Sequence, residues 1–146
     1  MANFEFDENA IPDLIHALEQ ADLYDTEVVE EMLFAGAQIL TDEAKSQMAR
    51  AGHVDTGDAI KHIGFTRKVK KGKTGAYSVT VTVKGKGKNG VPNAVKTFVA
   101  NYGRQERYGQ IVGSHFWNRA RQKAEPEMVR KCEEIATNKL KQKGLI

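Results

Sequence analysis

The chain has 146 residues, of which 40% are hydrophobic and 28% charged, and this predicts one soluble globular domain spanning residues 1–146. No apolar run approaches the ~18 residues of a membrane span, and the acidic N-terminus is unlike a signal peptide. The single cysteine, Cys132, excludes an internal disulfide. Composition therefore excludes disulfide-rich secreted scaffolds, membrane-spanning proteins and large multidomain enzymes.

The net charge of +3 conceals a strong segregation along the chain. Residues 1–60 hold 14 Asp and Glu against 2 Lys and Arg, whereas residues 61–146 hold 5 acids and 20 bases. Such asymmetry can serve a polyanionic partner, or copies of one protein that meet acidic face to basic face. It is also typical of a solvated surface whose two halves neutralise each other within the fold.

Apolar periodicity predicts two helices in the first third of the chain. The first spans Ile11 to Leu23. The second spans Thr26 to Ala51, with Asp25 or Thr26 as its N-cap and Gly52 at its end. Its apolar stripe consists of Val29, Met32, Leu33, Gly36, Ala37, Leu40, Ala44 and Met48.

The middle of the chain changes from helical to alternating periodicity. A short helix is predicted to start at residues 55–58 and to include Ile60 and Ile63. Residues 65–70 and 77–84 then alternate apolar with polar side chains, which predicts an antiparallel hairpin with one wet face. Residues 85–90 read as a basic, glycine-rich loop.

The last third of the chain again favours helices. Residues 94–102 predict a short helix ended by Gly103, and residues 104–113 are polar with a short strand at 111–112. Ser114 is the predicted cap of a final helix that Pro126 should kink or restart. The predicted fold is α+β, with a long N-terminal and a long C-terminal helix packed on a small antiparallel sheet that carries a basic hairpin.

Two glycine motifs resemble nucleotide-binding loops. Gly85, Gly87 and Gly90 have the spacing of the dinucleotide fingerprint, but the preceding strand alternates with Ser and Thr, whereas a Rossmann first strand is buried on both faces. Gly72-Lys73-Thr74 lacks the first glycine of a phosphate-binding loop, because Arg67 stands at that position. No cofactor is predicted.

Side chains with catalytic or metal-binding potential are few. His53, Asp55, His62 and His115 have no recognised ligand spacing and are interpreted as loop or surface residues. Cys132 falls on an apolar helical stripe, which favours a small core side chain over a nucleophile. The sequence therefore predicts no metal site and no catalytic site. A small enzyme would need a cleft that joins His53, Asp55 and His62.

The strongest functional signal is an acid-free basic segment in the hairpin and its loops. Its lysines and arginines can contact the phosphates of DNA or a partner protein, whereas a charged sheet edge that prevents aggregation is an equally good interpretation. Only Tyr77 is aromatic there, so any nucleic-acid contact would be to the backbone, without sequence reading. The cations are Arg67, Lys68, Lys70, Lys71, Lys73, Lys84, Lys86 and Lys88.

Three motifs together resemble a known family. Val54-Asp55-Thr56-Gly57 followed by residues 59–63 is similar to the "V-D-T-G-x-L-x-x-S-I" element of the small tail-component proteins of lambda-like long-tailed bacteriophages, the head–tail joining, neck and tail-completion proteins. Residues 98–103 (FVANYG) resemble that family's "aromatic-V-E-F-G" element, with Asn101 in place of the acid. Residues 115–120 (HFWNRA) resemble the start of its last helix.

The resemblance implies a structural virion protein, made in the host cytoplasm, that acts in head–tail joining or tail completion. It also implies an α+β fold, assembly into a homo-oligomeric ring, and other neck, tail or connector proteins as partners, with no membrane involved. The rival hypothesis is a basic nucleic-acid-binding module without sequence specificity. The motif residues with an expected structural role are Val54, Asp55, Thr56, Gly57, Tyr102, Gly103, Phe116 and Trp117.

Overall fold

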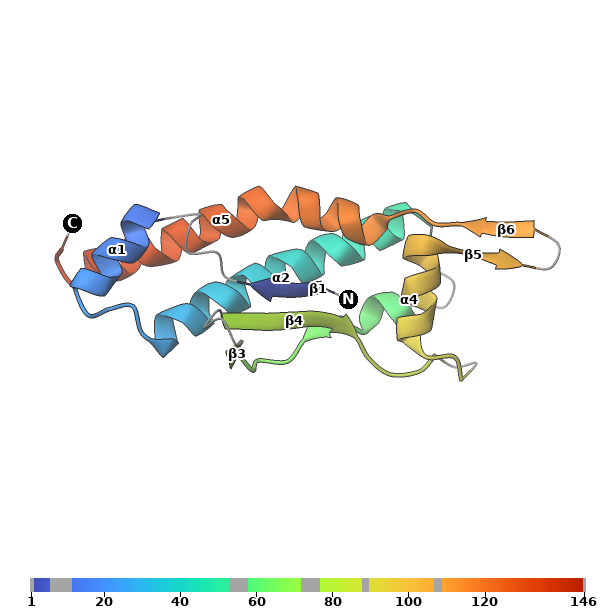
Figure 1. Cartoon of the computed structure of the whole chain (residues 1–146), viewed down its shortest axis with the longest axis horizontal. Coiled ribbons are helices and arrows are strands. Elements are labelled where there is room, and N and C mark those ends of the chain that lie inside the picture. Colours follow the sequence, from blue (N-terminus) through green and yellow to red (C-terminus); the bar gives the residue numbers. More distant parts are fainter. Residues whose placement is uncertain are drawn as a thin grey trace.

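The computed structural model shows an elongated α+β protein in which two long helices lie along one side of a small antiparallel sheet (Figure 1). It describes residues 2–5, 12–52, 58–71, 77–87, 90–106 and 109–145. The predicted α+β class is confirmed. The elements are β1 (Ala2–Glu5), α1 (Pro12–Gln20), α2 (Thr26–Arg50), α3 (Asp58–Lys61), β2 (Ile63–Phe65), β3 (Lys70–Lys71), β4 (Tyr77–Val83), α4 (Asn93–Tyr102), β5 (Gly103–Glu106), β6 (Gly109–Val112) and α5 (Phe116–Gln142).

Helices α2 and α5 form the main layer, side by side along the length of the molecule (Figure 1). All eight residues of the predicted α2 stripe are buried, which confirms that assignment. Asp25 is the N-cap, with its Oδ1 accepting from the Val28 N–H at 3.0 Å, and Gly52 with φ +81° follows the last turn. The facing residues of α5 are buried too: Phe116, Trp117, Ala120, Ala124, Met128, Cys132, Ile135, Ala136 and Leu140.

The sheet is built around β4, which pairs with β1 on one side and with β2 and β3 on the other, always antiparallel. Val79, Val81 and Val83 are buried against α2, while the alternate residues of β4 are half-buried on the other face. The predicted hairpin is confirmed, but its first strand is broken. Phe65 pairs with Val81 and Lys70 with Ser78, so residues 66–69 oppose only two residues of β4.

Several boundaries differ from the sequence-based prediction. Ile63 belongs to β2 and not to the short helix, because its side chain packs into the core opposite Val83. Helix α5 runs without restart through Pro126; the missing proline N–H costs one hydrogen bond, and the burial of residues on both sides keeps the helix continuous. Ser114 does not cap α5, because its Oγ donates instead to the Ala100 carbonyl at 3.1 Å.

Two strand pairings were not predicted. β1 occupies one edge of the sheet, and β5 and β6 form a hairpin that extends beyond the helices at one end of the molecule (Figure 1). A two-stranded hairpin is marginally stable by itself. In the described structure this one is supported by contacts with α4 at its base.

Cys132 lies between α2 and α5, and its reactivity reports on how closely the two helices pack. Its side chain is buried, with Sγ 3.9 Å from the Met32 carbonyl oxygen, and burial together with the charge of Glu133 raises the pKa of the thiol to about 11. The predicted role as a small core residue is confirmed. The thiolate is the reactive form, so the folded protein should react slowly with thiol reagents.

We expect native Cys132 to react with an aromatic disulfide at pH 8 at least about 100-fold more slowly than the urea-unfolded chain. The reason is that a thiol pKa raised from 9.0 to about 11 lowers the thiolate fraction by roughly that factor. The measurement is the rate of thiolate release with and without urea, with a free thiol as the control for the effect of urea. Equal rates would contradict a buried Cys132.

Candidate interaction surfaces

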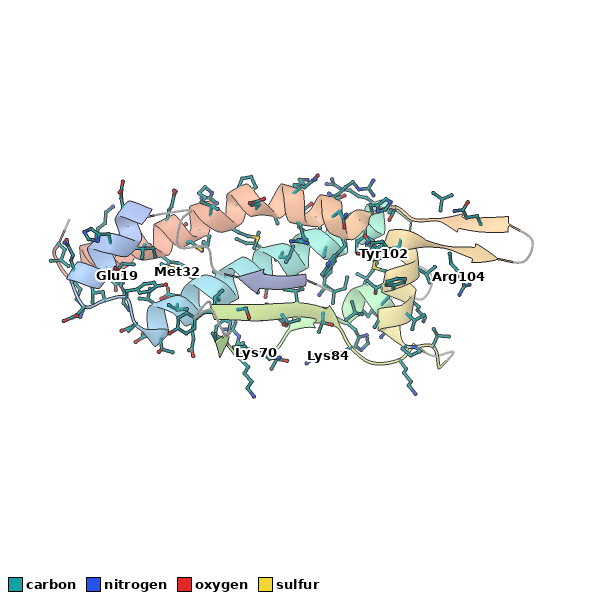
Figure 2. All side chains as sticks on the ribbon, viewed as in Figure 1. Glu19, Met32, Lys70, Lys84, Tyr102 and Arg104 are labelled. Atoms are coloured by element: carbon teal, nitrogen blue, oxygen red, sulfur yellow. The ribbon has the colours of Figure 1, made fainter. Side chains whose placement is uncertain are left out.

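The predicted basic segment forms an exposed surface on the sheet side of the molecule. Figure 2 shows Lys70 and Lys84 on the side turned away from α5. Lys71 lies in β3, and Lys73 and Lys88 fall outside the described residues. The cations with described side chains are all exposed: Arg67, Lys68, Lys70, Lys84 and Lys86.

Two of these cations are held by neighbouring side chains. The Arg67 guanidinium lies 5.4 Å from the centre of the Phe34 ring, and Lys84 Nζ donates to Thr66 Oγ1 at 2.7 Å. Lys68, Lys70 and Lys86 form no ion pair with any described carboxylate. Because residues 59–105 contain no Asp or Glu, the positive charge here is not neutralised by sequence neighbours.

The acidic first half and the basic second half of the chain are partly neutralised within the fold. Lys123 approaches Glu43 at 3.6 Å and Lys139 approaches Glu27 at 3.8 Å, and both pairs join α5 to α2. Exposed pairs of this kind contribute about 0–1 kcal/mol each. The structure therefore supports partial neutralisation along the two long helices, whereas Lys68, Lys70 and Lys86 on the sheet side form no ion pair with a described carboxylate.

Helix α4 carries an exposed apolar surface, which we call the α4 stripe and define as Val95, Phe98 and Tyr102. Phe98 is 61% and Tyr102 56% exposed, and their ring centres are 4.9 Å apart. The spacing of three and four residues places all three on one face of the helix. Val112 on β6 is 77% exposed at the same end of the molecule. Exposed aromatic side chains grouped in this way mark interaction sites.

The α4 stripe is positioned by a close junction between α4 and α5. Asn101 is buried, and its Oδ1 accepts a hydrogen bond from the Trp117 N–H at 3.0 Å, in the first turn of α5. The backbone N–H of His115 donates to the Asn101 carbonyl at 2.9 Å. A Cβ at Gly113 would lie 2.4 Å from that same carbonyl oxygen, so only glycine lets the chain pass this closely.

The family-like motif residues fall into three groups. Residues 54–57 lie outside the described residues. Gly103 ends α4 with φ +82°, as predicted, and Phe116 and Trp117, for which a structural role is expected, are buried in the core. Tyr102 is exposed and belongs to the α4 stripe. The apolar spacing of α4 is visible in the sequence, but the same spacing fits a core face or an interface.

The capping role of Asn101 was not predicted from the sequence. Its partner is 16 residues away and belongs to another helix, whereas sequence-based capping rules compare positions three residues apart. The signal that could have found it is the presence of an amide or acid just before an aromatic–glycine pair that ends a helix.

The described residues offer little for other kinds of chemistry. Among them, no group of three or more His, Cys, Asp or Glu side chains is placed to hold a metal ion. His62 and His115 are exposed and lie apart, at the ends of α3 and α5, while His53 and Asp55 are outside the described residues. None of the described helices is long and apolar enough to cross a bilayer.

Comparison with known protein families, curated proteins and solved structures finds no match to this chain. The likeness to phage tail components therefore rests on the three short motifs and the order of the elements.

The junction between α4 and α5 should depend on the acceptor at position 101. We expect Asn101→Ala to lower the free energy of unfolding by about 1–3 kcal/mol, because it leaves the buried Trp117 N–H without a partner. Asn101→Asp is the matched control, since it keeps an oxygen acceptor at the positive end of α5. Urea unfolding followed by circular dichroism measures both. A loss in Asn101→Ala of less than about 0.5 kcal/mol would show that the cap contributes nothing.

Proposed function

We propose that this chain is a structural virion protein of a tailed bacteriophage that acts at the neck or tail end, in head–tail joining or tail completion, and assembles there as a ring. The proposal starts from three motifs that occur in the family's order along one α+β chain. It assigns no catalytic residue, cofactor or metal to the protein.

One observation carries the proposal furthest: two of the three motifs meet in space at a single junction. Residues 98–103 and 115–120 are connected by the hydrogen bond from the Trp117 N–H to Asn101 Oδ1 and by the one from the His115 N–H to the Asn101 carbonyl. An acid, which the family's element has at this position, also carries an oxygen atom that can accept a hydrogen bond. The residues that carry the resemblance thus build the junction that presents the α4 stripe.

An exposed apolar stripe and a projecting hairpin at one end also suit an assembly protein. Both features should gain stability when a partner covers them, because the aromatic side chains are exposed and the hairpin is supported only at its base in the described structure. A head-to-tail arrangement of identical subunits closes into a ring when the rotation between neighbours permits.

The direct test uses tails assembled in a phage from which the gene for this chain has been deleted. We expect the purified protein to cosediment with these tails and to add density at one tail end in electron micrographs. Capsids without connectors are the control and should bind nothing. Absence of tail or connector binding at any concentration would overturn the proposal. The gene is also expected beside capsid, connector and tail-tube genes.

A basic nucleic-acid-binding module is the second candidate function, favoured by the exposed lysines of the sheet side that form no ion pair with a described carboxylate. In that case the affinity for duplex DNA should fall steeply with salt, with a log–log slope of about −0.9 for each phosphate contacted. Replacing Lys68, Lys70 and Lys86 by Ala should then flatten the slope by up to about 2.7.

The matched control for DNA binding instead removes three exposed cations from α5 and its C-cap: Arg121, Lys141 and Lys143. Filter binding or fluorescence anisotropy between low and physiological salt measures both triple variants. Equal slopes in the two variants, or no measurable binding by the wild-type chain, would remove this second candidate.

A further inference from the structure

The α4 stripe lies beside a small pocket at the junction of α4 and α5. The pocket has a volume of about 90 Å³. A cavity of about 150 Å³ holds a benzene ring, so this one has room for an aliphatic side chain. It is lined by Val83, Ala94, Thr97, Phe98, Asn101 and Tyr102, with Trp117.

Two nitrogen atoms of residues that line the pocket have no hydrogen-bond partner among the described residues. These atoms are Trp117 Nε1 and Asn101 Nδ2, and both are shielded from solvent. A buried donor without a hydrogen-bond partner is unfavourable. The pocket therefore favours a partner that inserts a group carrying an oxygen acceptor.

The opposite end of the same chain carries a group of acids on α1 and the start of α2, beside Lys139, Lys141 and Lys143 at the end of α5. Residues 12–31, which form α1 and the start of α2, contain seven Asp and Glu and no Lys or Arg. Of these acids only Glu27 forms an ion pair in the described structure, with Lys139 of α5. Figure 2 places Glu19 at the end of the molecule away from Tyr102 and Arg104.

An exposed apolar side chain accompanies these acids. Leu145 is 53% exposed, and the C-terminus lies beside α1 (Figure 1). The other large apolar side chains exposed in the described structure belong to α4, to the residues before it and to β6. One end of the molecule thus carries an apolar stripe with unpartnered donors beside it. The other end carries an acidic surface with one exposed leucine.

We propose that the α4 stripe of one copy docks on the acidic end of a second copy, which we define as α1 and the first two turns of α2. Because the two surfaces lie at opposite ends of an elongated subunit, the contact is head to tail and repeats from copy to copy. The head-to-tail contact rests on the proposed function, because it is the contact through which the ring would form. The contact itself is a property of the isolated chain.

Sedimentation velocity and native mass spectrometry at low salt test the contact with two variants, each blocked at one end. Phe98→Asp places a carboxylate in the stripe, and the double variant Glu19→Lys, Glu31→Lys reverses charge at the acidic end. We expect the wild-type chain to form oligomers that grow with concentration and weaken with salt. Each blocked variant alone should associate at least tenfold more weakly.

The decisive sample is an equal mixture of the two blocked variants. In a head-to-tail contact each variant keeps one intact surface, so the mixture should form dimers of one copy of each and nothing larger. A contact between two α4 stripes would instead let the Glu19→Lys, Glu31→Lys variant dimerise by itself. Gln122→Asp, which adds a carboxylate on the exposed face of α5, is the matched control and should behave as wild type.

Three results would overturn this contact: a wild-type chain that stays monomeric at hundreds of micromolar at low salt, a blocked variant that still associates normally, or a mixture without mixed dimers. Thermal unfolding of each variant by circular dichroism verifies that it is folded. Tail binding by a chain that never self-associates would overturn the contact and leave the proposed function. Self-association without tail binding would overturn the proposed function and leave the contact.

Discussion

The apolar contact between α2 and α5 is the interaction on which the rest of the molecule depends. Small residues occur on both helices, Gly36 and Ala37 on α2 and Ala120 and Ala124 on α5, and they let the two backbones approach while larger side chains fill the space between them. The valines of β4 pack on α2 as well, so this helix has a partner on each side. Cys132 lies within the same contact, where an ionised thiol would be unfavourable.

Two long helices packed along their lengths give the subunit two chemically different ends. One end holds α1, the acidic start of α2 and the C-terminus; the other holds α4 and the β5–β6 hairpin (Figure 1). The Asn101–Trp117 hydrogen bond ties α4 to the first turn of α5 and so fixes the direction in which Phe98 and Tyr102 face. The stability of the core and the presentation of the exposed stripe are therefore linked through one buried amide.

The charge segregation seen along the chain has two separate outcomes in space. Ion pairs from Lys123 and Lys139 of α5 reach acids of α2, which neutralises part of the difference inside one subunit. The sheet side retains exposed lysines because residues 59–105 supply no acid. Charged side chains are thus available to another molecule in two regions, the basic sheet side and the acidic end. The proposed head-to-tail contact uses the acidic end and the α4 stripe, and it does not use the basic sheet side.

The sequence alone determined the elements whose signals are local. The stripe of α2, its Asp25 cap and the alternation of β4 repeat at the spacing of the backbone itself, so each could be predicted from a window of a few residues. Only the tertiary structure showed β1, the β5–β6 hairpin and the Asn101 cap, because their hydrogen bonds join residues that no local period relates. Exposure of the α4 stripe was likewise decided by packing, since apolar spacing along a helix is the same whether that face meets a core or another molecule.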